Sequence, residues 1–290
     1  MFTIMPFIVL AALAWSAATE PIQASAGQND ADETVIVVAP EPVEELSLFH
    51  QALAREDYAA ARAVVDMLKA MRDPRIKPWM RIMRATLTVT VAVDFGVEEK
   101  ESLFHSDLKA ATRAIEWTLA QESEKSPDSR KASLHAALGT INLLDAQWEN
   151  EIDGDVLKAM GPAGRGYDEM KLAYSLDDSR MDALLGVAAY RFFKSNALKF
   201  LTWMPFMKDE REESLINMWQ VVTTHGPSQA GAVTTLAWAL IEMDRPEEAA
   251  ELCQPWLEAL GNPRHLLEPS AKAWFVAEDW DLSRAAYDLY

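Results

Sequence analysis

The side chains that most often catalyse reactions or hold metals are present in this sequence, but their spacing fits neither task. Five histidines are spread along the chain, and none belongs to an H-E-x-x-H metal motif. There is no G-x-S-x-G nucleophile elbow. The single cysteine, Cys253, falls in an apolar helical pattern that indicates a buried side chain. We therefore predict that the protein is not an enzyme and has no cofactor.

Two short stretches resemble ligand-binding loops in part. Glu149, Glu151 and Asp153 have the spacing of the first half of a calcium loop, but Met160 stands where the bidentate glutamate is needed. An acidic loop between helices is the alternative. The glycine-rich stretch 161–166 lacks the Lys-Ser/Thr that follows a phosphate-binding loop, so we predict a break in a helix there and no metal or phosphate site.

The segment 196–207, NALKFLTWMPFM, is the least ordinary part of the chain. About fifteen residues separate two predicted helices here, where a few would suffice. The segment is either an elongated first helix or a loop packed into the stack, or else it is an exposed apolar lip. Aromatic and methionine side chains suit an adaptable interface, so the candidate binding residues are Phe200, Trp203, Met204, Phe206 and Met207. A peptide, an apolar ligand or a second copy of the chain could occupy such a lip.

A second candidate lies near the N-terminus, where a β-branched run precedes two prolines. The run resembles the energy-coupling box of bacterial outer-membrane receptors, which pairs as a strand with a periplasmic coupling protein. The resemblance implies strand pairing by Thr34, Val35, Ile36, Val37 and Val38. The alternative is a simple extended linker over residues 27–43.

The first residues have the pattern of an export signal. An apolar run from Phe2 to Trp15 is followed by Ala24-Ser25-Ala26, which fits a small-x-small cleavage site. The run is too short for a membrane-spanning helix. We predict removal of residues 1–26 and a protein that is exported, with a periplasmic location.

The charge of the chain limits its partners. Forty-five acidic residues against 27 lysines and arginines give a net charge of −18. Such a surface repels phosphate backbones and anionic membranes, so we exclude nucleic acid as a partner. It favours solubility and basic partners.

From residue 44 onward the pattern is helical, and the helices fall into pairs. Apolar residues recur three and four positions apart, as for Ala61, Val65 and Leu68. The run 87–93 alternates like a strand, but the flanking helices favour a buried helix. The predicted pairs are 44–55 with 57–72, 78–95 with 100–123, 127–149 with 155–176, 179–194 with 208–224, 228–243 with 246–260, and 265–278 with 280–290.

The last two pairs repeat with a fixed period. A small residue near the start of the second helix recurs from Ala249 to Ser283, a step of 34 residues. Two antiparallel helices approach closely only where such residues cross, so we expect Ala237 and Ala271 to face them. Large residues, Tyr287 among them, are expected to fill the space between successive pairs.

These features resemble the tetratricopeptide-repeat superfamily, most clearly over residues 55–74, 167–186 and 232–263. The resemblance is to an irregular, exported bacterial member. It implies an all-α fold for residues 44–290, a right-handed superhelical stack of antiparallel helix pairs with a groove for protein segments. Our first hypothesis is thus a periplasmic scaffold or adaptor. The alternative is a protein that binds a small apolar ligand in a pocket closed by segment 196–207, and the third is a hydrolase, which converging carboxylates or a Ser–His contact would favour.

Overall fold

The structure of the protein is a computed structural model that describes residues 37–96, 101–199 and 208–290. All regular elements in these ranges are helical. They are α2 (Val43–Ala54), α3 (Tyr58–Ala70), α4 (Lys77–Phe95), α5 (Glu101–Gln121), α6 (Asp128–Gln147), the π-helix η1 (Trp148–Ile152), α7 (Val156–Leu176), α8 (Met181–Ala197), α9 (Arg211–Thr223), α10 (Gln229–Glu242), α11 (Pro246–Leu260), α12 (Arg264–Val276) and α13 (Trp280–Leu289). The predicted all-α class is confirmed, and each predicted pair matches two successive helices. None of the helices in the described ranges has the length and apolarity needed to cross a membrane.

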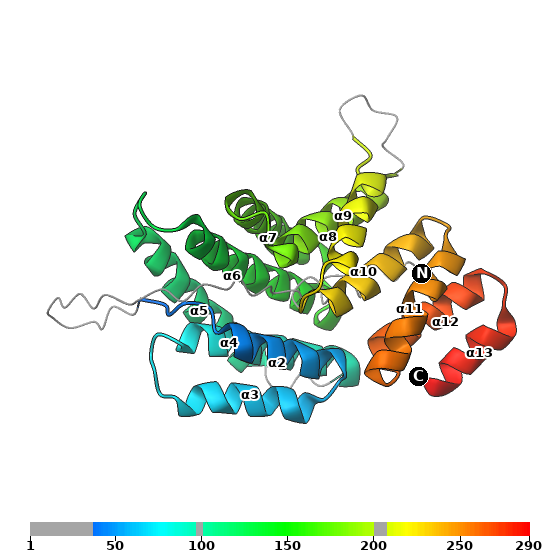
Figure 1. The fold of residues 1–290 in the computed structure, drawn as a ribbon, viewed down its shortest axis with the longest axis horizontal. Coiled ribbons are helices and arrows are strands. Elements are labelled where there is room, and N and C mark those ends of the chain that lie inside the picture. Colours follow the sequence, from blue (N-terminus) through cyan, green and yellow to red (C-terminus); the bar gives the residue numbers. More distant parts are fainter. Residues whose placement is uncertain (1–36, 97–100, 200–207) are drawn as a thin grey trace, which may run out of the picture.

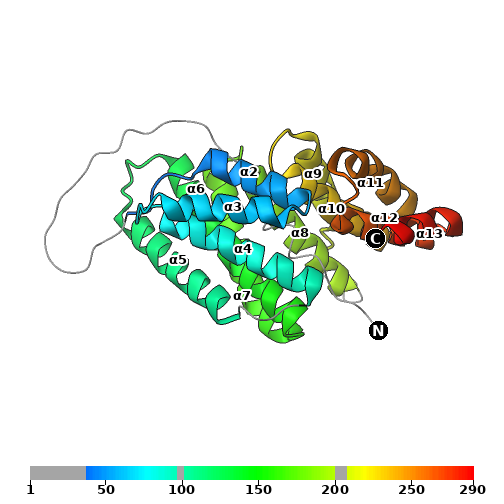
Figure 2. The same cartoon turned by 90° about the horizontal axis from the view of Figure 1, so that it is seen from below.

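The helices form a two-layer stack. Each helix contacts the next along the chain, and the first helices of successive pairs (α2, α4, α6, α8, α10 and α12) also contact one another in that order. Figure 1 shows α5 and α13 on opposite sides of the molecule, and Figure 2 shows the same arrangement from below. This order of contacts is typical of helix pairs that each cover the apolar face of the one before.

Helix α4 includes the run that alternates like a strand. Threonine is accommodated in this helix because each hydroxyl donates a hydrogen bond to a carbonyl four residues earlier. The donors are Thr86, Thr88 and Thr90, to Ile82, Arg84 and Thr86 respectively. The buried-helix interpretation of this run is therefore confirmed.

Three of the pairs turn in the same way. Glu56, Asp244 and Glu278 each have a left-handed backbone, with φ of 56°, 60° and 62°. In each turn the next residue's N–H donates to the carbonyl five residues before it, at 2.9–3.0 Å. From Asp244 to Glu278 the step is again 34 residues, so the spacing found in the sequence is a spacing of equivalent turns.

Small residues lie at the helix crossings that follow these turns. Ala61 and Ala249 are fully buried, and Ser283 is 3% exposed. The Ser283 hydroxyl donates to the carbonyl of Ala271 at 3.1 Å, which confirms that these two positions face each other. The expectation for Tyr287 was wrong. This side chain is 46% exposed, because no further described pair covers α13.

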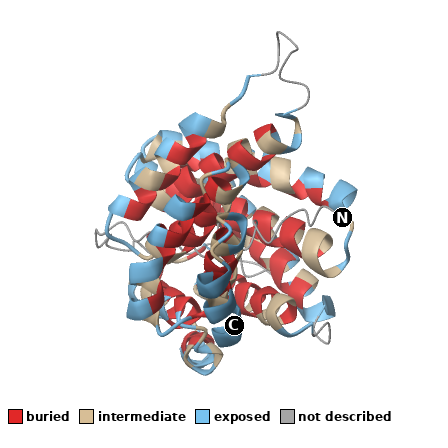
Figure 3. Ribbon diagram, turned by 90° about the vertical axis from the view of Figure 1, so that its right-hand side faces the viewer, coloured by how far each residue is buried: buried red, intermediate tan, exposed pale blue. Residues whose placement is uncertain are grey.

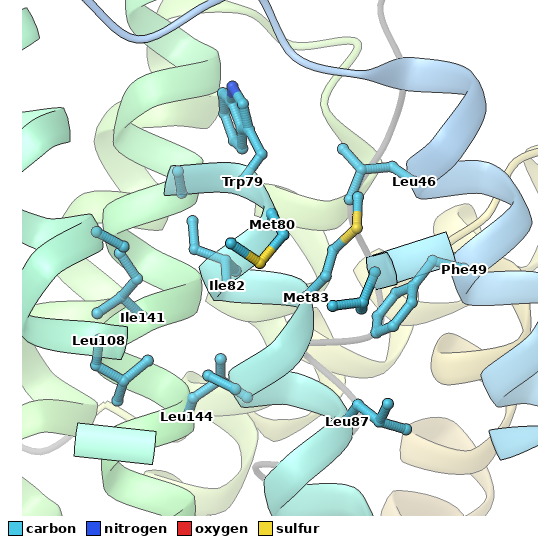
Figure 4. Packing of buried hydrophobic residues seen from close by; sticks show 14 of the residues in the cluster. Leu46, Phe49, Trp79, Met80, Ile82, Met83, Leu87, Leu108, Ile141 and Leu144 are labelled. Atoms are coloured by element: carbon cyan, nitrogen blue, oxygen red, sulfur yellow. The ribbon is translucent and has the colours of Figure 1, made fainter. Parts of the chain in front are cut away.

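The core runs through the stack as three adjoining apolar clusters. One joins α2 to α6, a second joins α6, α7 and α8, and the third joins α8 to α12. Figure 4 shows the first, in which Phe49, Trp79 and Met83 pack between helices. Buried residues lie on the faces that neighbouring helices turn toward each other (Figure 3). Successive helices from α2 to α12 therefore share buried apolar residues with their neighbours.

The extended segment before α2 is part of this folded core. Val38 is 1% exposed, its N–H donates to the Thr118 hydroxyl at 3.0 Å, and its carbonyl accepts from Arg130 at 2.8 Å. Glu41 pairs at 2.8 Å with Arg180, which is fully buried. The described part of the predicted linker is thus anchored to the stack.

Two further features differ from a simple open row of pairs. Helix α7 continues through the glycine-rich stretch 161–166, where a break was predicted, and Pro162 lies inside it. In addition, the first and last pairs meet. The α2–α3 turn is bonded to α12 through Glu56 and His265, at 3.1 Å from the His265 N–H. The stack therefore closes on itself (Figure 1).

Candidate binding groove

A hollow of about 470 Å³ lies where α5, α6 and α7 meet. Each helix contributes side chains three or four residues apart, which is the spacing of one helical face. The lining residues are His105, Leu108, Lys109, Thr112 and Glu116 from α5, Leu138, Ile141, Asn142 and Asp145 from α6, and Arg165, Asp168 and Glu169 from α7. We call this hollow the α5–α7 groove.

The groove has an apolar floor and a charged rim. Leu108, Leu138 and Ile141 are at most 5% exposed and belong to the core. Lys109 and Arg165 are exposed cations on opposite walls, and acidic side chains lie beside both. A surface of this kind can bury a few apolar atoms while it pairs charges of both signs at its edges.

Hydrogen bonds fix the amide at the centre of the groove. The Asn142 amide nitrogen donates to the Leu138 carbonyl at 2.8 Å, and the amide oxygen accepts from Arg165 Nε at 3.0 Å. Arg165 Nη2 also lies 4.0 Å from the Asp145 carboxylate. The polar side chains on α6 and α7 are therefore oriented before any ligand binds, which lowers the entropy cost of binding.

Asp145, on the α6 wall of the groove, has a pKa that its surroundings shift. Partial burial raises its pKa above the ordinary value, and the charges of His105 and Arg165 oppose that shift. His105 Nδ1 lies 3.7 Å from Asp145, and its ring meets the edge of Trp148 at 5.8 Å between centroids. A group with a raised pKa beside two donors is suited to accept a hydrogen bond or a cationic group from a ligand.

A second histidine–carboxylate contact fixes α7 against α6. His135 Nδ1 and Glu169 Oε2 are 2.7 Å apart, and both side chains are partly exposed. Glu169 also lines the groove, so this contact determines where its carboxylate stands.

The binding residues predicted in segment 196–207 could not be placed. Phe200, Trp203, Met204, Phe206 and Met207 lie outside the described residues. The first residues of the segment continue α8 to Ala197. There Asn196 donates to Glu242 on α10 at 2.8 Å. The hypothesis of an apolar binding lip stays a prediction.

The predicted strand-pairing run is described only at its end. Thr34, Val35 and Ile36 lie outside the described residues. Val37 is 46% exposed, whereas the backbone N–H and carbonyl of Val38 already bond to Thr118 and Arg130. The Val38 backbone therefore bonds within the protein, and the strand-pairing hypothesis depends on the residues before Val38.

The acidic stretch that resembles half a calcium loop forms the end of η1 and the turn into α7. Lys158 pairs with Asp155 at 3.2 Å and lies 3.9 Å from Glu149. Within the described ranges there is no group of three or more His, Cys, Asp or Glu side chains arranged to hold a metal ion.

The sequence analysis did not single out the α5–α7 groove. Its signal was present as a mixed polar stripe at helical spacing on three consecutive helices, for example Lys109, Thr112 and Glu116. Such stripes also mark ordinary solvated faces, so the stripe becomes informative only when three helices bring their stripes together. Known proteins add no further assignment, since no family model, curated protein or solved structure matches the chain.

Proposed function

We propose that this protein is an exported, tetratricopeptide-like scaffold that works by binding and not by catalysis. In this proposal an extended segment of a partner protein lies in the α5–α7 groove. The observation that carries the proposal is a hollow of about 470 Å³ with an apolar floor and fixed polar groups, on a stack of helix pairs. Helical stacks commonly bind through such surfaces.

The groove chemistry favours a polypeptide over a purely apolar ligand. An extended peptide offers backbone N–H and C=O groups at regular intervals, and the Asn142 amide and Asp145 carboxylate are placed to pair with them. Lys109 and Arg165 can meet acidic side chains of the partner, whereas Glu116 and Asp168 can meet basic ones. A partner with charges of both signs is therefore expected.

Site-specific photo-crosslinking in the native host tests this function. The photoreactive residue p-benzoylphenylalanine replaces Lys109 in the groove or, as a control, Arg62, which is exposed on α3. Crosslinked proteins are then identified by mass spectrometry. We expect defined partners at position 109 that are absent at position 62.

A charge reversal shows whether the groove itself makes the contact. Arg165→Glu should remove the adduct at position 109 without changing the melting temperature, because the Arg165 side chain is 61% exposed. The matched control Arg62→Glu should leave the adduct in place. Equal yields in both variants would contradict binding in the groove.

The export part of the proposal rests on the apolar run and the Ala24-Ser25-Ala26 pattern, and N-terminal sequencing of the native protein checks it. The alternative, a small apolar ligand closed in by segment 196–207, stays a prediction because most of that segment lies outside the described residues.

A further inference from the structure

Where the stack closes on itself, carboxylates from distant parts of the chain come together. Glu56 ends the α2–α3 turn, Asp94 lies in the last turn of α4, Glu151 belongs to η1, and Glu268 lies on α12. Glu151 is close enough to Asp94 and Glu268 to interact with both charges, and Asp94 interacts with Glu56 in the same way. We call these four residues the acidic junction.

Two of the four carboxylates have partners within the protein. The Tyr58 hydroxyl donates to Asp94. Glu56 accepts from the His265 N–H at 3.1 Å, and the His265 ring nitrogen Nδ1 lies 3.2 Å from the same oxygen. The first contact joins α3 to α4, the second joins the first pair to the last, and neither involves Glu151 or Glu268.

The junction contains more negative than positive charge. Four carboxylates meet one guanidinium, that of Arg264, and one imidazole, that of His265. The Arg264 side chain donates to the backbone carbonyl of Asp94 at 3.2 Å and lies 4.7 Å from the Tyr290 ring, so it does not form a carboxylate pair at close range. Among the described residues, the junction therefore contains more carboxylates than cationic groups.

The pKa values of the junction respond to this imbalance. The pKa of Glu151 is raised to about 8, mainly by burial and also by the charges of Asp94 and Glu268, while the hydrogen bond from the Gln147 side chain opposes the shift. Burial also raises the pKa values of Asp94 and Glu268, against the lowering effect of Arg264. For Glu56, burial would raise the pKa, but the hydrogen bonds from His265 outweigh it.

Buried polar atoms without partners lie at the same place. Gln147 is fully buried, and its side chain lies near enough to Glu151 to lower the pKa of that carboxyl, while no other described group bonds to its amide atoms. Glu151 Oε1, Arg264 Nε and His265 Nε2 are buried and lack a hydrogen-bond partner among the described residues. Such groups are rare in native proteins because each costs free energy, so a polar ligand that bonded to several of them at this site would be stabilised.

The local backbone supports the same conclusion. Gln147 lies at the end of α6 and Glu151 in η1, a π-helical turn of a kind that is frequent at functional sites. The turn places Glu151 toward α4 and α12, where its two charged neighbours lie.

We propose that the acidic junction is a binding site for an organic ammonium group, supplied by a small polyamine or by a lysine side chain. Such a group brings the missing positive charge and donates the hydrogen bonds that Glu151 and Gln147 lack. Aromatic side chains lie close by, since Tyr58 hydrogen-bonds Asp94 and Tyr287 interacts with Glu268. An organic cation fits better than a metal ion, because no part of the described chain offers a metal-ligand group.

Converging carboxylates are also what the hydrolase hypothesis required. Here, however, Asp94 is bonded to Tyr58 and Glu56 to His265, so these two carboxylates are committed to holding the helices together. Of the two that remain, Glu151 lies beside the Gln147 amide and Glu268 is partly exposed, an arrangement that suits binding. No Ser–His hydrogen bond occurs in the described ranges to supply a nucleophile.

Isothermal titration calorimetry of the mature protein tests the site, with 1,5-diaminopentane as the probe. We expect binding that strengthens between pH 6 and pH 9, with release of about one proton at pH 7, because the ammonium group favours ionised Glu151. Glu151→Gln should weaken binding at least about tenfold and abolish the proton release. Glutamine mimics the protonated carboxyl, so the fold should be retained.

A matched variant separates this site from general attraction to an acidic protein. Glu247→Gln removes one negative charge from an exposed position on α11 and should leave the affinity unchanged. Equal weakening in Glu247→Gln and Glu151→Gln, or no heat from the amine at millimolar concentration, would overturn the proposal. So would binding of calcium chloride with no binding of the amine.

A second titration identifies the source of the ammonium group. The probe is acetyl-Ala-Lys-Ala-amide, with acetyl-Ala-Gln-Ala-amide as its uncharged control. Tighter binding of the lysine peptide than of the diamine would assign the site to a partner's side chain, and the reverse order would assign it to a free amine. The site is independent of the α5–α7 groove, so Arg165→Glu should bind the amine like the wild type.

Discussion

His50 is the residue with the most unusual environment in the core. It lies on α2, is 5% exposed, and neither ring nitrogen has a hydrogen-bond partner. Burial alone lowers its pKa from 6.5 to about 4, and no charged group contributes to the shift. The unfolded chain therefore binds a proton between these pH values that the folded chain does not.

Acid should destabilise the protein through this residue. Stability contributed by neutral His50 is present above pH 6.5 and is lost as the pH falls toward 4. When the pH is lowered from 7 to 5, we expect the free energy of unfolding of His50→Leu to rise by about 2 kcal/mol relative to that of the wild type. Urea denaturation at both pH values measures the difference, with exposed His225→Gln as the control. A difference that does not change with pH would mean that His50 is not buried in its neutral form.

Residue types at the helix crossings could be predicted from the sequence, but polar environments could not. The small side chains of Ala249 and Ser283 follow from a period of 34 and from the short distance between crossing helices. That His50 is buried without a hydrogen-bond partner could not be predicted, because whether an imidazole finds a partner depends on side chains far along the chain.

At the scale of the elements, the closest helix packing involves glycines on α6, α7 and α8. A Cβ atom added at Gly166 would come within 2.9 Å of Leu143 Cγ and 3.2 Å of the Gly139 carbonyl oxygen. One of these is a backbone atom, so the contact cannot be relieved by a side-chain rotation alone. These glycines therefore permit α6 and α7 to approach each other.

Gly166→Ala should push α7 away from α6 and cost about 1–3 kcal/mol of stability. The matched control is Gly164→Ala on the same helix, where the nearest atom, the Tyr190 hydroxyl oxygen, would be 3.8 Å away. Alanine there should stabilise the helix by about 0.5–1 kcal/mol. Thermal melting of the two variants should give shifts of opposite sign. A loss of the same size in both would mean that glycine is needed in α7 for another reason.

Helix positions were predictable because apolar spacing, turn residues and prolines are local signals. The break predicted at residues 161–166 was wrong for the same reason. Locally, three glycines and a proline weaken a helix, but in the stack two of the glycines and Pro162 lie where α7 meets its neighbours. Tertiary contacts outweigh the local preference.

The α5–α7 groove and the acidic junction depend on the whole molecule. Each groove wall is a stripe that looks like an ordinary solvated helix face until three helices stand together. The junction joins residues more than two hundred positions apart, as between Glu56 and His265. Periodicity predicts that pairs stack, but the small rotation between successive pairs decides whether the ends meet, and no single residue encodes that rotation.

The closure of the stack should depend on a few polar contacts. The described hydrogen bonds that close the stack come from Arg264 and His265 on α12. Arg264 donates to the Asp94 carbonyl on α4, in the second pair, and His265 bonds to Glu56 in the turn of the first pair. Each hydrogen bond to a charged group contributes on the order of 1.5–3 kcal/mol, whereas neighbouring pairs are held by continuous apolar packing. Removing the polar contacts should open the ends without unfolding the pairs.

For the double variant Arg264→Ala with His265→Ala, we expect a larger radius of gyration in small-angle X-ray scattering. We also expect hydrogen exchange at least about tenfold faster in the α2–α3 turn, with helical circular dichroism unchanged. Arg284→Ala is the control, since its contact with Asp288 lies within α13 and the side chain is 84% exposed. If the double variant has the scattering curve and the exchange rates of the control, closure must come from the apolar packing of intermediate pairs, and the polar contacts at the junction would then be a consequence of closure.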